Sequence, residues 1–239
     1  EGGDTPEVGG LNAWEEYIDF AKNGNLKDDA NFAKLAEQMD LENFTDYLIA
    51  ETYSGNTSLS HNTMAWKTHD GGKWRWILMD TDRGFFNYDE NLISYFIPRS
   101  AWPLKNMLNN EGFKKYFFKR MADQLFTTFN TNEIFRQIDE HKADIDPVIS
   151  QHVDRWLGTT SSYGDALKSV QFCQNEVNKL KDFATGRMPV LMDDLRNYGL
   201  SAPAMLSISS WPDNACQYDF NGHAIHKSAW SGLYPTRSD

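Results

Sequence analysis

Residues 73–84 read KWRWILMDTDRG and form the stretch around which the rest of the chain is expected to fold. Side chains in this stretch alternate with a period of two, which predicts an extended strand. One set is Trp74, Trp76 and Leu78, and the other is Arg75, Ile77 and Met79. Because both sets are largely apolar, we expect this strand to be buried on both faces.

Two carboxylates close the predicted strand. If the extended geometry continues through them, Asp80 and Asp82 point to the same side, about 6.5 Å apart along the chain. That spacing suits two oxygen ligands of a hard cation such as Mg²⁺, and Gly84 lets the backbone turn sharply just after them. An Asp-x-Asp pair at the end of a strand is also typical of an ordinary turn, so both interpretations stay open.

A turn signal precedes the strand. The Asp-Gly-Gly sequence at residues 70–72 separates residues 62–69 from residues 73–80, which predicts an antiparallel hairpin. The hairpin would bring its entry loop close to the end of the sheet that carries the two aspartates.

That entry loop, residues 55–62, holds further polar side chains. Asn62 has an amide oxygen, which is also a hard ligand, and it could complete a cation site with Asp80. The alternative is that Asn56, Ser58 and Asn62 form hydrogen bonds within their own loop.

An ordered series of motifs links this region to the rest of the chain. The series is Leu48-Ile49-Ala50-Glu51-Thr52-Tyr53-x-Gly55-Asn56-Thr57, Asn62, Trp74-Arg75-Trp76-Ile77-Leu78-x-Asp80-x-Asp82-x-Gly84-Phe85, Trp102-Pro103-Leu104, Phe113-x-x-x-Phe117, Ala122-Asp123, His152-x-x-Arg155-Trp156 and Phe183-Ala184-x-x-Arg187. It resembles the CotH family, the atypical kinases of the spore-coat-protein-H type. The resemblance covers about residues 11–200.

The resemblance implies a kinase-like C-terminal lobe that uses ATP and Mg²⁺. Asp80 would be the catalytic, metal-binding aspartate after the hairpin, Asn62 the second metal ligand, and Asp82 an assisting one. Asn56 would face the nucleotide together with Asn62 and Asp80. Arg187 matches a position of the family and is expected to act as a structural brace.

The chain departs from the family at Ser58. Family members commonly have Asp here, in a Gly-Asn-x-Asp run, and that carboxylate orients the acceptor hydroxyl and takes its proton. A serine hydroxyl cannot act as a base at neutral pH without help. Ser58 therefore stands at the catalytic position of the family with a side chain that is poorly suited to the reaction.

A second departure precedes Leu11. The family's N-terminal lobe, which supplies much of the nucleotide pocket and a basic residue for the phosphates, has no counterpart there. Residues 1–10 instead have the composition of a loop. We therefore expect a fragment of a longer protein that carries half of an active site.

The overall charge is acidic, because 23 Lys and Arg residues face 34 Asp and Glu residues, for a net charge of −11. This balance disfavours a nucleic-acid partner, which requires clustered cations, and suits basic peptides. The expected partners are a nucleotide and a protein substrate or surface partner. No apolar run is long enough to span a membrane, and no signal peptide is visible. A secreted or cell-surface location follows from the resemblance alone.

Helical periodicity dominates the rest of the first 200 residues. A helix over residues 41–54 is predicted to begin after a cap at Asp40 and to lead directly into the entry loop. Glu51 on this helix could point into the cleft, but we expect it to be solvated or paired on the helix surface. Further along, Pro147 is expected to open a helix, Gly186 to interrupt one, and Pro189 to open the last.

Beyond residue 200 the composition changes. Short alternating segments are separated by Pro and Gly, which predicts strands, and Asn221-Gly222 is a hairpin signal. The segment 201–239 is too short to have a good core of its own. We expect it either to pack on the lobe or to begin a truncated β module.

These features together predict a mainly α, α+β protein, with a helical lobe and central β-hairpin over residues 1–200 and a β-rich tail over residues 201–239. The expected function is phosphoryl transfer from ATP to a protein Ser or Thr, weak or absent in this chain. The alternative is a catalytically silent, secreted or surface-exposed binding or adhesion module. Asn62 and Asp80 favour the first function, and Ser58 favours the second.

Overall fold

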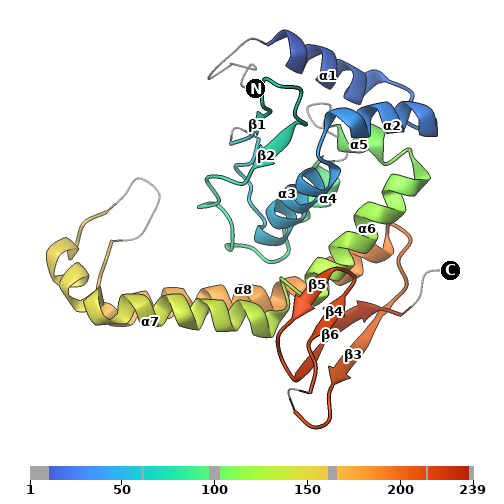
Figure 1. The fold of residues 1–239 in the computed structure, drawn as a ribbon. Coiled ribbons are helices and arrows are strands. Elements are labelled where there is room, and N and C mark those ends of the chain that lie inside the picture. The colour runs from blue at the N-terminus through green and yellow to red at the C-terminus, as the bar shows by residue number, and fades with distance from the viewer. Residues whose placement is uncertain (1–10, 61, 97–102, 161–165, 214, 237–239) are drawn as a thin grey trace.

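The computed structural model describes residues 11–60, 62–96, 103–160, 166–213 and 215–236. The predicted loop at residues 1–10 and Trp102 lie outside these ranges. Within them the chain forms eight helices and three two-stranded antiparallel sheets, so the protein is mainly helical, as predicted (Figure 1). The elements are α1 (Asn12–Asn23), α2 (Asp29–Gln38), α3 (Leu41–Ser54), β1 (Met64–Trp66), β2 (Arg75–Ile77), α4 (Leu92–Phe96), α5 (Leu104–Met107), α6 (Glu111–Phe126), α7 (Thr131–Trp156), α8 (Val170–Arg196), β3 (Pro203–Ser209), β4 (Tyr218–Phe220), β5 (His223–Ile225) and β6 (Ala229–Pro235).

The predicted hairpin is formed by β1 and β2, which pair antiparallel with Ala65 opposite Trp76. Trp76 is buried, and its ring centroid lies 4.5 Å from that of Phe44 on α3. Trp74 meets Trp14 of α1 edge to face at 4.9 Å. Aromatic packing of this kind fixes one face of the hairpin against the helices.

Two details of the predicted strand are wrong. β2 ends at Ile77, and Asp80 has a φ of 50°, in the left-handed region, so the extended geometry does not reach the aspartates. Burial is also confined to one face of β2, because Arg75 and Ile77 are exposed, and Leu78 and Met79, which lie beyond the strand, are exposed as well. α1 and α3 pack on the face that carries the two tryptophans. The apolar residues on both faces of the predicted strand did not indicate that only one face would be covered.

α3 supports both the hairpin and the entry loop. It begins as predicted after Asp40, whose carboxylate accepts the N–H of Asn43 at 3.1 Å. The Asn43 amide oxygen accepts the N–H of Trp76 at 2.6 Å, and its amide nitrogen donates to the Trp76 carbonyl at 3.2 Å. Asn43 thus bonds β2 as a neighbouring strand would, and the other end of α3 leads into the loop that contains the candidate site.

α7 and α8 run antiparallel and form a long arm that extends from the rest of the molecule (Figure 1). The predicted helix breaks are wrong, since Pro147 lies inside α7, and Gly186 and Pro189 lie inside α8. Gly186 has a different role, because a Cβ there would lie only 2.7 Å from Cγ of Tyr88. No described helix has a stretch both long and apolar enough to cross a membrane.

The C-terminal tail packs against the end of α6. β3 and β6 pair along their length, and β4 and β5 form the predicted hairpin, with positive φ at Asn221 and Gly222. The ring of Phe126 lies 4.6 Å from that of Phe220 and 5.6 Å from that of Tyr234. These contacts join the tail to the helical part through aromatic burial.

Candidate functional site

Most of the predicted site residues meet where α3 ends. Asn56 is fully buried, and its amide nitrogen donates to the backbone carbonyl of Asp80 at 3.3 Å. Its amide oxygen accepts the backbone N–H of Ser58 at 3.1 Å and the Ser58 hydroxyl at 3.0 Å. Asn62 in turn donates its amide to Ser58 Oγ at 3.2 Å. A hydrogen-bonded path therefore joins Asn62, Ser58, Asn56 and the backbone of Asp80, and it contains the bonds within the loop that the alternative interpretation expects.

The aspartate loop is open to solvent but attached to α3. Asp80 and Asp82 are exposed, and neither forms an ion pair with another residue in the described part of the chain. Just beyond them, Phe85 donates its N–H to the carbonyl of Ser54, the last residue of α3, at 2.7 Å. Gly84 allows this approach, because a Cβ there would lie 3.0 Å from Cβ of Ser54.

Arg187 of α8 braces the same end of α3. Its guanidinium is completely buried and donates to the carbonyls of Thr52 and Tyr53, and to those of Tyr88 and Glu90 in the following loop. Burial lowers the pKa of Arg187 to about 10, which leaves it cationic at neutral pH. A positive charge thus satisfies carbonyls at the negative end of the α3 dipole.

Glu51 lies inside the protein, so the expectation of a solvated or paired surface residue is wrong. Burial raises the pKa of its carboxyl group, and hydrogen-bonding interactions with Asn56 and Tyr47 partly offset that effect. Neither carboxylate oxygen has a partner with good hydrogen-bond geometry among the described residues. The burial of Glu51 could have been predicted from the sequence, because Phe44, Leu48 and Glu51 follow the i, i+4, i+7 spacing of one helix face.

The side chains near the end of α3 include oxygen donors of the types that a hard cation binds. Asp80 and Asp82 have exposed carboxylates, and Asn62 has an amide oxygen. Carboxylate and amide oxygens are both ligand types that Mg²⁺ prefers. Within the described residues, no three or more His, Cys, Asp or Glu side chains gather as a preformed metal site. Mg²⁺ commonly takes one or two carboxylates and completes its shell with water and substrate phosphates. These residues therefore suit an ion that arrives with a nucleotide better than a permanently held structural metal.

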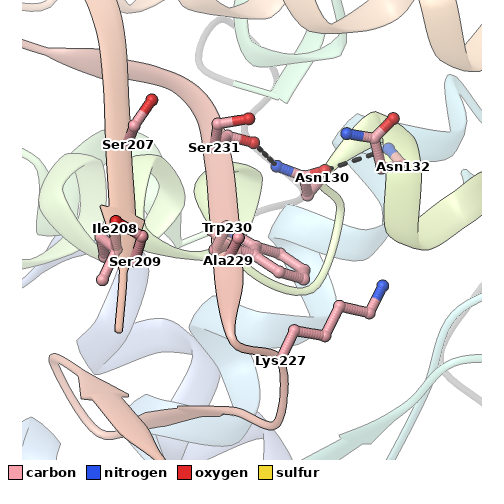
Figure 2. Close-up of a pocket in the computed structure, with 9 residues that line it drawn as sticks. All are labelled: Asn130, Asn132, Ser207, Ile208, Ser209, Lys227, Ala229, Trp230 and Ser231. Carbon is pink, nitrogen blue, oxygen red and sulfur yellow. Dashed lines mark hydrogen bonds between the residues drawn. The ribbon is translucent and has the colours of Figure 1, made fainter. Parts of the chain in front are cut away.

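Two pockets have linings that include none of the predicted site residues. One is a groove of about 760 Å³ between α3, β2 and α6. Figure 2 shows the other, of about 320 Å³, between the β3–β6 pair and the start of α7. There Lys227 pairs with Glu133 at 3.3 Å, and Asn130 donates to the Ser231 carbonyl at 2.8 Å. Neither pocket is lined by a predicted site residue, so neither adds to the candidate site.

A family model described as CotH kinase protein matches residues 3–191. No curated protein and no solved structure matches the chain significantly. The matched range extends from α1 into α8 and includes every predicted site residue.

Proposed function

The chain belongs to the CotH kinase family, and on that premise we propose that it takes part in phosphoryl transfer from ATP to a Ser or Thr hydroxyl of a protein. The observation that carries this proposal is the hydrogen-bonded path from Asn62 through Ser58 and Asn56 to Asp80. This path holds the entry loop beside an aspartate loop that is open to solvent.

Each residue has a role in this proposal. Asp80 and Asp82 would hold Mg²⁺ together with the Asn62 amide oxygen, and such an ion would supply positive charge to neutralise the phosphates. Asn56 fixes the backbone of Asp80, whose left-handed φ of 50° needs support from its surroundings. Ser58 stands at the position of the family that faces the acceptor hydroxyl.

A binding module without transfer is the second candidate, and the bonding of Ser58 favours it. The Ser58 hydroxyl donates to Asn56 and accepts from Asn62, so it is engaged in both directions. It also lacks the carboxylate that would accept a proton in phosphoryl transfer. In this proposal the protein is secreted or displayed at the cell surface, and its net charge of −11 suits a basic protein partner.

Thermal unfolding with Mg²⁺ and ATP separates the two candidates. A ligand that binds the folded chain raises its melting temperature, so the wild-type protein is expected to melt higher with Mg²⁺ and ATP. Asp80→Ala is expected to abolish this shift, and Asp144→Ala on the exposed face of α7 is the matched control that keeps it. The absence of a wild-type shift, or an equal shift in Asp80→Ala, contradicts the nucleotide site and leaves the binding module.

A second variant tests the role of the entry loop. Ser58→Asp restores the carboxylate that the family commonly has at this position, and Asn62 already donates to the side chain there. Transfer of the γ-phosphoryl group to a mixed Ser and Thr peptide library is expected to increase. Thr57→Asp adds the same charge at the exposed neighbouring position and is the control. If Ser58→Asp leaves transfer unchanged, Ser58 does not occupy the acceptor position.

A further inference from the structure

The carboxyl group of Glu51 is the least explained polar group near the candidate site. Its side chain is 0% exposed, and neither oxygen has a well-aligned hydrogen-bond partner among the described residues. Burying an ionisable group in this way is unfavourable unless something compensates for it. An apolar residue would fit the same helix face, so packing alone does not explain why a carboxyl group is buried here.

Asn56 supplies that reason through its remaining hydrogen-bonding capacity. An asparagine side chain has two N–H donors and an oxygen that accepts two bonds. The oxygen is filled by the N–H and hydroxyl of Ser58, and one N–H is directed to the Asp80 carbonyl. The carboxyl group of Glu51 interacts with the Asn56 side chain, which makes it the candidate acceptor for the other N–H.

The backbone of Glu51 is bonded to the same turn. Its carbonyl accepts the backbone N–H groups of Gly55 at 3.1 Å and Asn56 at 3.3 Å, and the Ser54 hydroxyl at 3.0 Å. Main chain and side chain of Glu51 therefore both act on Asn56. Tyr47, one turn earlier on α3, also interacts with the carboxyl group.

We propose that Glu51 is a positioning residue, whose carboxyl group receives the second amide N–H of Asn56 and thereby sets the orientation of that amide. A flipped amide would place the Asn56 oxygen against both the Glu51 carboxyl group and the Asp80 carbonyl, where only acceptors face it. In the orientation that Glu51 selects, Asn56 holds the Asp80 loop with its nitrogen and the Ser58–Asn62 pair with its oxygen. The effect on cation binding rests on the proposed function, but the effect on Asn56 does not.

The orientation of Asn56 can be read from its side-chain amide resonances in protein labelled with ¹⁵N asparagine. Glu51→Met removes the acceptor at similar size, and we expect the Asn56 amide signals to move and their exchange with water to accelerate. Glu51→Gln keeps an acceptor oxygen and is expected to restore signals close to those of the wild type. Thr45→Val is the matched control, because Thr45 also buries an oxygen on α3 that has no partner among the described residues, and it should leave the Asn56 signals in place.

Unchanged Asn56 signals in folded Glu51→Met would overturn the inference. If Glu51→Met does not fold, Glu51→Asp takes its place, because the shorter side chain withdraws the carboxyl group from Asn56. Displaced Asn56 signals in Glu51→Asp, with signals retained in Glu51→Gln, then support the positioning role. Signals that stay in place in Glu51→Asp refute it.

Mn²⁺ binding, followed by electron paramagnetic resonance of the free ion, tests the consequence for the site. Loss of a residue that orients a ligand loop is expected to weaken Mn²⁺ binding about 10-fold or more in Glu51→Met, with recovery in Glu51→Gln. Equal affinity in all three proteins would contradict a role in positioning the cation ligands. If the wild type does not bind Mn²⁺, the proposed function fails, and the Asn56 spectra still decide whether Glu51 orients this side chain.

Discussion

The last turns of α3 and α6 both bury a carboxyl group, but in contrasting surroundings. Asp123 near the end of α6 accepts from Lys119 at 2.7 Å, from Asn221 at 2.9 Å and from the Tyr234 hydroxyl at 2.6 Å. Glu51 near the end of α3 has no partner of comparable geometry in the described residues. One carboxylate is fully used in joining two parts of the chain, and the other is held beside the candidate site.

The two carboxyl groups differ in role: Asp123 connects two parts of the fold, whereas Glu51 lies next to the candidate site. The end of α6 is completed by the β-rich tail, which also donates the Trp230 indole N–H to the Phe126 carbonyl at 2.8 Å. The end of α3 is completed by Arg187, which bonds backbone carbonyls and leaves the carboxyl group of Glu51 to interact with Asn56. Groups that are already satisfied stabilise the fold, whereas a group with spare capacity can orient its neighbours.

The largest expected effect comes from removing the brace on α3. Arg187→Met leaves buried carbonyls of two segments without donors, and we expect the free energy of unfolding to fall by about 4 kcal/mol or more. Arg196→Met on the same helix, which breaks an exposed pair with Asp193, is the control and should cost about 0.5 kcal/mol or less. Urea unfolding of both variants measures this difference, and similar losses would contradict the assigned role of Arg187.

The next effect concerns the joint at α6. Asp123→Ala leaves Asn221 and Tyr234 without their shared acceptor, and we expect a loss of about 2 kcal/mol in the free energy of unfolding. Amide hydrogen exchange in β6 should accelerate as the tail loosens. Glu51→Gln is the matched change in α3 and is expected to cost less than about 1 kcal/mol, because it breaks no well-formed bond. Equal losses in the two variants would remove the contrast between the two carboxyl groups.

A smaller effect is expected at the contact between α8 and the loop after the aspartates. Gly186→Ala places a methyl group against Tyr88 and is expected to destabilise the protein by about 1 kcal/mol. In a Tyr88→Ala background the clash is gone, so the same change should stabilise the helix by about 1 kcal/mol through its higher helix propensity. A double-mutant cycle with urea unfolding tests this reversal of sign. The same sign in both backgrounds would show that the contact with Tyr88 is not the reason for Gly186.

The smallest expected effect is a pH dependence of the free energy of unfolding that comes from Glu51. It is small because Asn56 and Tyr47 offset part of the rise in pKa that burial causes. Burial raises the pKa of this carboxyl group above its ordinary 4.5, so the folded state binds the proton more tightly than the unfolded state. Its contribution to stability is therefore greatest below about pH 4.5 and declines as the pH rises through the raised value. The free energy of unfolding of the wild type, relative to Glu51→Gln, should fall over that range. A difference between the two proteins that stays constant with pH would contradict the raised pKa.

Local patterns in the sequence predicted the elements near the site. The Asp-Gly-Gly turn and the alternation around Trp74 and Trp76 predicted the hairpin, and Asp40 predicted the start of α3. These features depend on residues close together in the chain, and the structure confirms them. The length of β2 and the exposure of Leu78 were predicted wrongly, because both depend on which surfaces the helices cover.

A mainly helical chain with one central hairpin, a kinase family and oxygen donors for a cation could all be inferred from the order of the residues. Three features depend on how distant segments pack: Asn56 joins the Asp80 backbone to Ser58, Arg187 bonds the end of α3, and Glu51 is buried. The two groups differ in the range of the interactions that produce them. Periodicity and turn chemistry act over a few residues, whereas the bond from Arg187 to Tyr53 joins positions 134 residues apart and forms only when the helices pack.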